Sequence, residues 1–299
     1  MVKKKTVLFE FPNPMDNDCL VGHESTLKTF VDAWNNRDKH PIHPVWMLCG
    51  PRGIGKATLA YKIAKTVYGN VGDFFIIDLP HNIDDRGNLK TDAKFISVNT
   101  VRSMIEKMQM SSMSGQWRVV LIDSVDELTV AAENAVLKLL EEPPQQTLFL
   151  LVTHQLSNVL PTVRSRARVE KMHPLTISQL RELCVKFMDD TEISSEILKL
   201  SNGSFGKIAN LKSSGGDIIY KELLNVLQDK HSNASNIMNI ATKIASDSTL
   251  YTIVLDAIAY FKLADLYPMA TRTISDITRL NLKADITIFK IINEIKKCL

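Results

Sequence analysis

The apolar positions in the first half of the chain form short continuous runs, at residues 45–48, 74–77, 119–122 and 148–152. Each run is apolar at every position instead of at alternate ones, which is typical of parallel strands buried on both faces. Helix-length segments, such as 57–68 and 98–108, lie between the runs. This alternation predicts an α/β domain in which helices cover both faces of a parallel sheet.

The second half has a different pattern, because strand signals stop after about Pro174 and apolar residues recur at helical spacing. Thr176 is the expected N-cap of the first helix in this half. A Ser-Ser-Gly-Gly break at residues 213–216 then separates a small helical unit from a larger one. We therefore predict three domains, at 1–170, 171–214 and 215–299.

Composition narrows the classes of protein to consider. A chain of 299 residues, of which 45% are hydrophobic, can bury a sizeable core. Its formal charge of +3 gives no strong overall field, so any contact with DNA has to be local. No segment approaches the roughly 18 uncharged apolar residues of a membrane helix, and the apolar run after residues 3–5 is too short for a signal peptide. We expect a cytoplasmic protein with no membrane partner.

The four cysteines are widely spaced and form no CxxC pair; they lie at Cys19, Cys49, Cys184 and Cys298. This spacing argues against a disulfide framework and against a thiolate zinc site. We therefore expect reduced thiols, in agreement with a cytoplasmic location.

The run GPRGIGK at residues 50–56 follows a predicted strand and precedes a predicted helix, which is the context of a phosphate-binding loop. Glycines allow backbone N–H groups to converge on a phosphate, and Lys56 would reach the terminal phosphates of a nucleotide. The predicted nucleotide-binding residues of the run are Gly50, Gly53, Gly55 and Lys56. In the alternative interpretation, the turn serves only the fold geometry and Lys56 is simply solvated.

The position after Lys56 usually carries a Ser or Thr whose hydroxyl binds magnesium, but here it is Ala57. Thr58 is the candidate replacement and is included among the predicted nucleotide-binding residues. One residue further along a helix is rotated by about 100°, however, which turns the Thr58 side chain away from the mouth of the loop. One magnesium ligand is therefore missing.

A second acidic motif lies at residues 118–123, where a predicted buried strand ends in Asp123. This arrangement places a carboxylate near nucleotide-bound magnesium. AAA+ proteins that hydrolyse ATP usually continue with a Glu that polarises water, whereas this chain has Ser124, which is a poor base. Asp126 and Glu127 fall where the next helix is predicted to begin, and we expect them to be caps or dipole partners. Ala57 and Ser124 together predict a silent ATPase site.

The segment AENAVLKLLEEPP at residues 132–144 resembles the DNA polymerase III delta-prime family of bacterial AAA+ clamp-loader subunits. Its physical interpretation is an amphipathic helix that the two prolines terminate. The resemblance extends to residues 20–23, which lie near the nucleotide base in relatives, and to Thr153-His154, which implies a nucleotide contact by Thr153. It covers roughly residues 11–211, and it implies a AAA+ fold followed by a helical lid and a helical C-terminal collar.

The element Ser165-Arg166-Ala167 is similar to a Ser-Arg-Cys element of this family. The resemblance implies that Arg166 is an arginine finger with a catalytic role in trans, at the ATP of a neighbouring subunit. A guanidinium suits this role because it can stabilise charge on a transferring phosphoryl group. In the alternative interpretation, Arg164, Arg166 and Arg168 form a solvated basic cluster or contact DNA phosphates.

The run GSFGK at residues 203–207 resembles the sensor-2 element of the family, where an arginine often contacts nucleotide. Here the position is Lys207, which lacks the planar fork of arginine. Alternatively, Ser204 caps a helix and Lys207 is an exposed lysine. Many relatives also carry a zinc-bound cysteine cluster, but residues 66–74 contain no cysteine, so we expect no zinc.

The resemblance implies a subunit that takes ATP as cofactor, if any, without hydrolysing it. Such a subunit is a rigid element of a hetero-oligomeric ring and acts in DNA replication together with motor and delta subunits. It reaches the sliding clamp and primed DNA through the complex, and it is not the polymerase itself. One alternative is an active AAA+ ATPase in which Thr58 and Asp126 replace the lost groups. Another is a nucleotide-free scaffold in which Lys56 is vestigial.

Overall fold

The computed structural model describes residues 14–17, 19–68, 73–84, 87–89, 93–110 and 117–299. These residues form two compact units. The α/β unit contains the described part of residues 12–183 together with residues 203–206, and the helical unit contains residues 184–202 and 207–299. The predicted division into three domains, at 170 and 214, stays a prediction.

A five-stranded parallel sheet forms the centre of the α/β unit, in the order β2-β3-β4-β1-β5. The strands are β1 (Val45–Cys49), β2 (Phe74–Asp78), β3 (Arg118–Asp123), β4 (Thr147–Thr153) and β5 (Arg168–Lys171). The four strands predicted from continuous apolar runs are confirmed. The fifth was missed because its sequence, RVEK, is short and charged, and such a sequence is common at the edge of a sheet.

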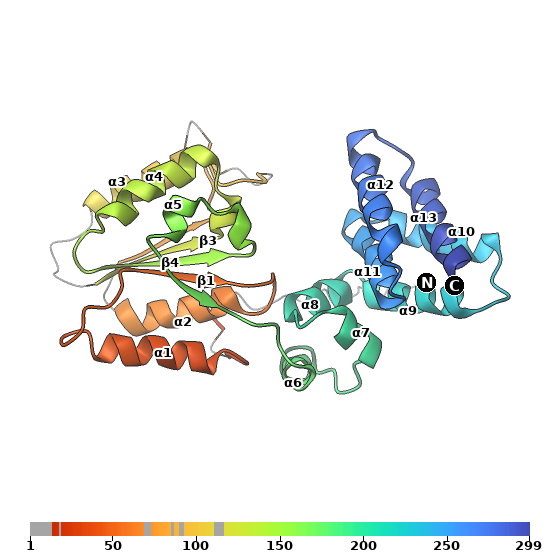
Figure 1. Ribbon diagram of the computed structural model, residues 1–299, viewed down its shortest axis with the longest axis horizontal. Coiled ribbons are helices and arrows are strands. Elements are labelled where there is room, and N and C mark those ends of the chain that lie inside the picture. Colours follow the sequence, from red (N-terminus) through yellow and green to blue (C-terminus); the bar gives the residue numbers. More distant parts are fainter. Residues whose placement is uncertain (1–13, 18, 69–72, 85–86, 90–92, 111–116) are drawn as a thin grey trace, which may run out of the picture. The chain divides into compact units, whose positions relative to one another are not determined.

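Helices cover both faces of this sheet, as the alternating pattern predicted (Figure 1). One face carries α1 (Glu24–Asn35) and α2 (Lys56–Tyr68), and the other carries α3 (Val98–Met110), α4 (Val130–Glu141) and the short α5 (Pro161–Arg164). Successive residues of β1 alternate between the two cores. Val45 and Met47 pack with the core under α3 and α4, while Trp46 and Leu48 pack with the core above α1 and α2. A strand with two buried faces needs apolar residues at every position.

The helical unit is built largely from six helices: α8 (Phe205–Ser213), α9 (Gly216–Gln228), α10 (Ala234–Ala245), α11 (Thr252–Tyr260), α12 (Tyr267–Arg279) and α13 (Ala284–Cys298). The predicted break at 213–216 separates α8 from α9, and Gly215 has the positive φ of +69° there. Helix α10 packs against α13. The ammonium of Lys296 on α13 donates to three carbonyls at the end of α9, those of Val226, Leu227 and Asp229, at 2.6–2.9 Å.

Two further helices, α6 (Ile177–Met188) and α7 (Ser195–Leu200), connect these regions in the sequence. The prediction of Thr176 as an N-cap is confirmed, because its hydroxyl accepts from the Gln179 N–H at 3.3 Å. The Gln179 side chain accepts in return from the Thr176 N–H at 2.9 Å. This reciprocal pair is a capping box and fixes the start of α6. None of the helices formed by the described residues is both long enough and apolar enough to span a membrane.

Candidate nucleotide site and arginine turn

The phosphate loop, residues 50–56, connects β1 to α2 in the α/β unit. Gly53 and Gly55 have φ values of +77° and +103°, a region that favours glycine. A Cβ atom on Gly53 would lie 2.4 Å from the Ser204 hydroxyl, and one on Gly50 would lie 2.5 Å from the Met172 carbonyl oxygen. Backbone conformation and close packing therefore both require the glycines that the motif supplies.

Two contacts hold the phosphate loop from outside. The N–H of Gly206 donates to the Gly53 carbonyl at 2.9 Å, and the His23 Nε2 lies 2.7 Å from the Ile54 carbonyl oxygen. Burial lowers the pKa of His23, so the neutral imidazole that donates from Nε2 is the favoured form. The structure thus gives His23, which the resemblance places near a nucleotide base, a contact with the loop itself.

Lys56 is buried, with only 3% of its surface exposed, so the alternative in which it is simply solvated is wrong. Its ammonium donates to the carbonyls of Gly50 and Pro51, at 2.8 and 2.6 Å. Burial lowers the pKa of Lys56 to about 8, although the charges of Asp123 and Asp126 oppose this shift. Burial likewise raises the pKa of Asp123 to about 6, and Lys56 opposes that shift. Both groups are therefore charged near neutral pH.

Buried hydroxyl groups without hydrogen-bond partners in the described structure lie at the carboxyl ends of the two central strands. They belong to Ser124, after β3, and Thr153, at the end of β4. The Nδ1 atom of His154 is likewise buried without a partner. Because an unpaired buried polar group costs free energy, such a cluster fits a polar ligand. Thr58 is buried in α2 while Ala57 is half-buried, which agrees with the expected rotation of Thr58.

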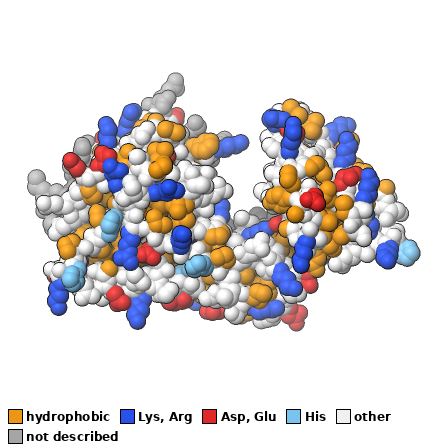
Figure 2. All heavy atoms as spheres, viewed as in Figure 1, with side chains coloured by type: hydrophobic (Ala, Val, Ile, Leu, Met, Phe, Trp, Pro, Cys, Tyr) orange, Lys and Arg blue, Asp and Glu red, His pale blue; other side chains and the backbone are white. Residues whose placement is uncertain are grey.

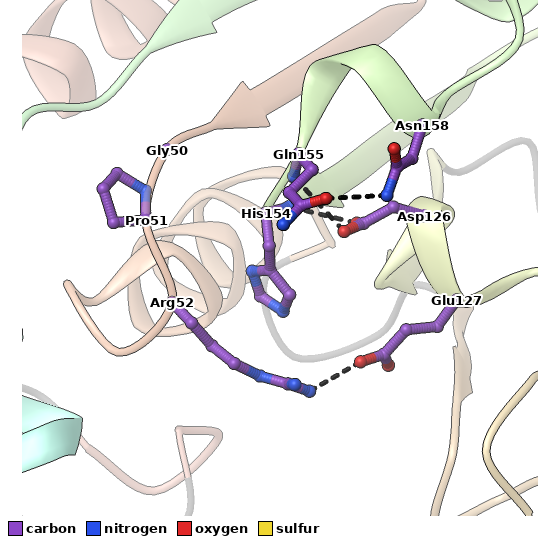
Figure 3. Close-up of a pocket in the computed structure, with 8 residues that line it drawn as sticks. All are labelled: Gly50, Pro51, Arg52, Asp126, Glu127, His154, Gln155 and Asn158. Carbon is purple, nitrogen blue, oxygen red and sulfur yellow. Dashed lines mark hydrogen bonds and ion pairs between the residues drawn. The ribbon is translucent and has the colours of Figure 1, made fainter. Parts of the chain in front are cut away.

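A pocket of about 600 Å³ opens beside the phosphate loop (Figure 3). Its volume is in the range of small-molecule sites. Arg52 reaches across it and pairs with Glu127, with 2.6 Å between Nη2 and Oε1. The pKa of His154 is lowered to about 4, first by burial and then by Lys56, so its ring is neutral near pH 7. The lining residues are Gly50, Pro51, Arg52, Asp126, Glu127, His154, Gln155 and Asn158.

Asp126 and Glu127 do not cap α4, so the cap part of that prediction is wrong, whereas the role as dipole partners stays a prediction. They belong to a short 3-10 segment, Val125–Glu127, and the N-cap of α4 is Thr129, whose hydroxyl accepts from the Ala132 N–H. The two carboxylate oxygens of Asp126 instead accept from the N–H groups of His154 and Gln155, at 3.0 and 3.2 Å. This carboxylate joins the end of β4 to the segment after β3.

Most of the residues that line the pocket were not among the predicted nucleotide-binding residues. Arg52 lies within the phosphate loop and His154 follows Thr153, so both stand next to predicted residues. Gln155 and Asn158 belong to a loop and a short 3-10 segment after β4, and they carry no motif of their own. Proximity to the carboxyl end of β4 is the signal that could have found them, because ligands bind at this edge of parallel sheets.

The arginine turn, residues 160–166, contains α5 and ends in Arg166. The Arg166 Nη1 donates to the Thr162 carbonyl at 2.9 Å, and its Nη2 lies 3.0 Å from Oε1 of Glu141. Arg166 does not line the pocket of its own chain. Arg168 stacks over Trp46 and pairs with Glu170, and the alternative of a basic cluster that includes the exposed Arg164 stays open.

Lys207 lies on α8 in the helical unit, where its ammonium pairs with Asp256 of α11 at 2.5 Å. It is therefore ion-paired, and the alternative of an exposed lysine is wrong. Of the region where relatives carry a zinc cluster, residues 69–72 lie outside the described structure. The described residues contain no group of three or more His, Cys, Asp or Glu side chains that could hold a metal ion.

Comparison with known proteins gives the family. The model of a family described as "DNA polymerase III, delta subunit" matches residues 22–176, which are more than half of the chain. The chain belongs to this family. It is thus a delta-subunit-like AAA+ clamp-loader protein of DNA replication, and the match covers the phosphate loop, Asp123, α4 and the arginine turn.

Curated relatives come from all three domains of life. Replication factor C subunit 3 of Oryza sativa is 25% identical over 275 residues, which are 92% of this chain and 71% of the relative. The DNA polymerase III subunit delta' of Pseudomonas aeruginosa is 31% identical over 183 residues, which are 53% of this chain and 52% of the relative. Two other polymerase III relatives are covered over 51% and 28% of their length.

The fold is also found in solved structures. The gamma subunit-related protein of Thermotoga maritima has a TM-score of 0.52 and 15% identity, with 92% of this chain and 99% of that chain covered. At this identity the likeness concerns the fold alone. The predicted fold class, a parallel α/β sheet of AAA+ type followed by a helical region, is confirmed.

Proposed function

We propose that this chain is a delta-prime-type subunit of the clamp loader, which does not hydrolyse ATP and supplies Arg166 to a neighbouring motor subunit. The observation that carries the proposal is that the acidic residues after Asp123 already have hydrogen-bond or ion-pair partners within the chain. Ser124 stands where a base is needed, both oxygens of Asp126 accept backbone N–H groups, and Glu127 pairs with Arg52. These contacts leave the carboxylates of Asp126 and Glu127 engaged within the chain.

The rival function, an active ATPase, needs Thr58 and Asp126 to replace the lost groups. Thr58 lies one residue further along α2, where the helix turns it away from the mouth of the loop, and Asp126 is engaged at the end of β4. These contacts favour the silent subunit. In contrast, Arg166 retains 36% exposure of its side chain outside the pocket of its own chain, as a group that acts in trans requires.

Nucleotide binding without hydrolysis is part of the proposal, since the residues present fit a nucleotide. The phosphate loop and Lys56 would hold the phosphates, and the unpaired hydroxyls of Ser124 and Thr153 offer further polar contacts. The ammonium of Lys56 donates to carbonyls of the loop. The phosphates of a bound nucleotide would give it an anionic partner. Asp123 would face the magnesium side. A contact from Lys207 would require its ion pair with Asp256 to break.

The other loader subunits are the proposed partners, with the sliding clamp and primed DNA reached through the complex. Large apolar side chains on the surface of the helical unit support a role in assembly, and Figure 2 shows apolar groups gathered around α11 and α12. Such patches mark interaction surfaces. They include Ile218, Tyr267, Leu280, Leu282 and Ile286. On this proposal, the C-terminal helices form the collar of the ring.

The test of the proposal is steady-state ATP turnover of a reconstituted clamp loader that carries Arg166→Ala. We expect turnover to fall by about 10³-fold, the scale on which arginine fingers act, while the complex still assembles. Arg164→Ala is the matched control, because Arg164 is an exposed arginine in the same turn. Equal turnover of the Arg166→Ala and wild-type complexes would reject the role in trans.

The silent site has its own test, hydrolysis of magnesium-ATP by the isolated chain, with Lys56→Ala as the control for contaminating enzymes. We expect no turnover that depends on Lys56. Turnover that Lys56→Ala abolishes would establish the rival function.

A further inference from the structure

The arginine turn is short and depends on its neighbours for its position. Helix α5 has only four residues, and Leu160, which precedes it, provides no side-chain cap. Val163 points into the core under α3 and α4, while the residues on either side of it are exposed. One helical turn has little stability of its own, because nucleation of a helix is unfavourable.

Helix α4 contacts the start of this turn through Glu133. This residue is 5% exposed, and its Oε1 accepts from the Leu160 N–H at 2.9 Å. No lysine or arginine in the described part of the chain forms an ion pair with it. Burial raises the pKa of the Glu133 carboxyl, and the bond from Leu160 opposes the shift. A buried carboxylate is costly, so its backbone contact is a specific feature of the site.

The same helix contacts the end of the turn through Glu141, its last residue. Oε1 of Glu141 lies 3.0 Å from Nη2 of Arg166, and the Thr162 carbonyl holds Nη1. Eight residues, or about 12 Å along the helix, separate Glu133 from Glu141. The two acids of α4 therefore hold the backbone where the turn begins and the guanidinium where it ends.

We propose that Glu133 and Glu141 are positioning residues for Arg166, an inference that rests on the proposed function of this arginine. Glu133 fixes the turn on α4 through a buried bond that does not change when Arg166 acts. Glu141 directs the guanidinium through an exposed ion pair, in which an anionic oxygen of the neighbouring subunit's nucleotide can replace it. Exchange is easy there, because an exposed ion pair contributes little free energy.

The first experiment measures ATP turnover of the reconstituted loader with substitutions at Glu133. We expect Glu133→Ala to lower kcat about tenfold with little change in KM, because a misplaced catalytic group slows chemistry while ATP still binds at the neighbour. Glu133→Gln keeps an oxygen that can accept from Leu160, so kcat should return to within about twofold of wild type. Equal losses in both variants would overturn the role of Glu133.

A double substitution separates positioning from general damage. If Glu133 acts through Arg166, Glu133→Ala should cause no further loss of turnover in a loader that already carries Arg166→Ala. A further tenfold loss would overturn the proposal, because Glu133 would then act independently of the arginine.

Glu141 has a natural control in the neighbouring acid, Glu142, which is also exposed. We expect Glu141→Ala to lower kcat of the loader about threefold, since Thr162 still holds one side of the guanidinium. Glu142→Ala should leave kcat unchanged. The same loss in both variants would show that the charge of this region matters, and not the contact with Arg166.

Hydrogen exchange of the full-length chain tests the position of the turn without any assay of turnover. In Glu133→Ala, the amides of Leu160 and of residues 162–166 should exchange about tenfold faster, while those of β4 keep their protection. Unchanged exchange would overturn the role of Glu133 even if Arg166 proves to be a finger. If instead Arg166→Ala leaves turnover unchanged, the proposed function fails, and the exchange result alone decides whether Glu133 holds the turn.

Discussion

The phosphate loop and the arginine turn lie in the same α/β unit but differ in how their cationic groups are held. At the loop, Lys56 is buried against two carbonyls and Arg52 pairs with Glu127 across the pocket. At the turn, Arg166 is half-exposed and has one exposed acidic partner, Glu141. Lys56 is therefore enclosed by the chain, whereas the guanidinium of Arg166 remains in contact with solvent. On the proposed function, the chain has lost its own hydrolysis and keeps the arginine that serves a neighbour.

The largest expected effect is on the free energy of unfolding of Gly53→Ala. This substitution tests whether packing fixes the phosphate loop. The new Cβ would meet the Ser204 hydroxyl at 2.4 Å in a backbone with positive φ. We expect a loss of about 3 kcal/mol in the free energy of unfolding, from strain and overpacking together. Urea denaturation of the chain measures it.

Gly87→Ala is the matched control for that prediction. Its φ is +80°, but no atom lies within 4 Å of the added Cβ. It should lose only the conformational part, about 1 kcal/mol. Equal losses at the two glycines would mean that Ser204 and Gly206 do not constrain the loop.

The next effect concerns the pH dependence of stability, through Asp123. Its pKa in the folded chain, about 6, lies above the ordinary value of 3.8, so folding favours the protonated carboxyl. The resulting stabilisation is complete below pH 4 and is lost as the pH rises through 6. We expect the free energy of unfolding of the wild type to fall by about 2 kcal/mol across this window, relative to Asp123→Asn. Urea denaturation at pH 4, 5, 6 and 7 compares the two, and parallel profiles would contradict a buried charge at Asp123.

A smaller effect is expected on the affinity for ATP, and it should differ between Glu127 and Glu141, the two acids that pair with an arginine. Glu127→Gln removes the charge that occupies Arg52 at the pocket, so the affinity of the chain for ATP should rise about fivefold, or about 1 kcal/mol. Glu141→Gln makes the same change at the arginine turn and should leave this affinity unaltered. Isothermal titration of both variants measures it, and a rise in both would show that net charge, not the pocket contact, governs binding.

The smallest effect is on stability at the turn. The side chains of Arg166 and Glu141 are 36% and 45% exposed, so solvent screens their pair. Glu141→Gln should change the free energy of unfolding by less than about 0.5 kcal/mol. A loss of several kcal/mol in urea denaturation would indicate that this pair is structural, as the contacts of the phosphate loop are.

Local sequence patterns predicted those elements whose structure is determined by residues close together in the sequence. Continuous apolar runs gave four strands, and the glycines and lysine of residues 50–56 gave the phosphate loop. Strand β5 was missed because pairing with β1, and not its own charged sequence, makes it a strand. The hydrogen bonds of Asp126 were missed for a related reason, since its partners are backbone groups 28 and 29 residues away.

The motif also could not reveal that an ion pair between Arg52 and Glu127 crosses the pocket. Arg52 and Glu127 are 75 residues apart in the sequence. Each is a charged residue of a type that is common on protein surfaces, so nothing in the sequence pairs them. Ser124 was recognised as the loss of a base, but its burial without a partner depends on the packing around β3. A substitution within a motif can be recognised from the sequence. The contacts that replace the lost ones can be recognised only in the folded structure.

The hydrogen bond from Gly206 to the Gly53 carbonyl has a consequence for synthesis on the ribosome. All five strands precede residue 172, so the sheet can form before the rest of the chain emerges. The phosphate loop, however, has only the contact from His23 and lacks the bond from Gly206 until residue 206 has left the exit tunnel. A nascent chain that stalls between these points would have a complete sheet and a loop open to nucleotide and to proteases, and only continued translation would close it.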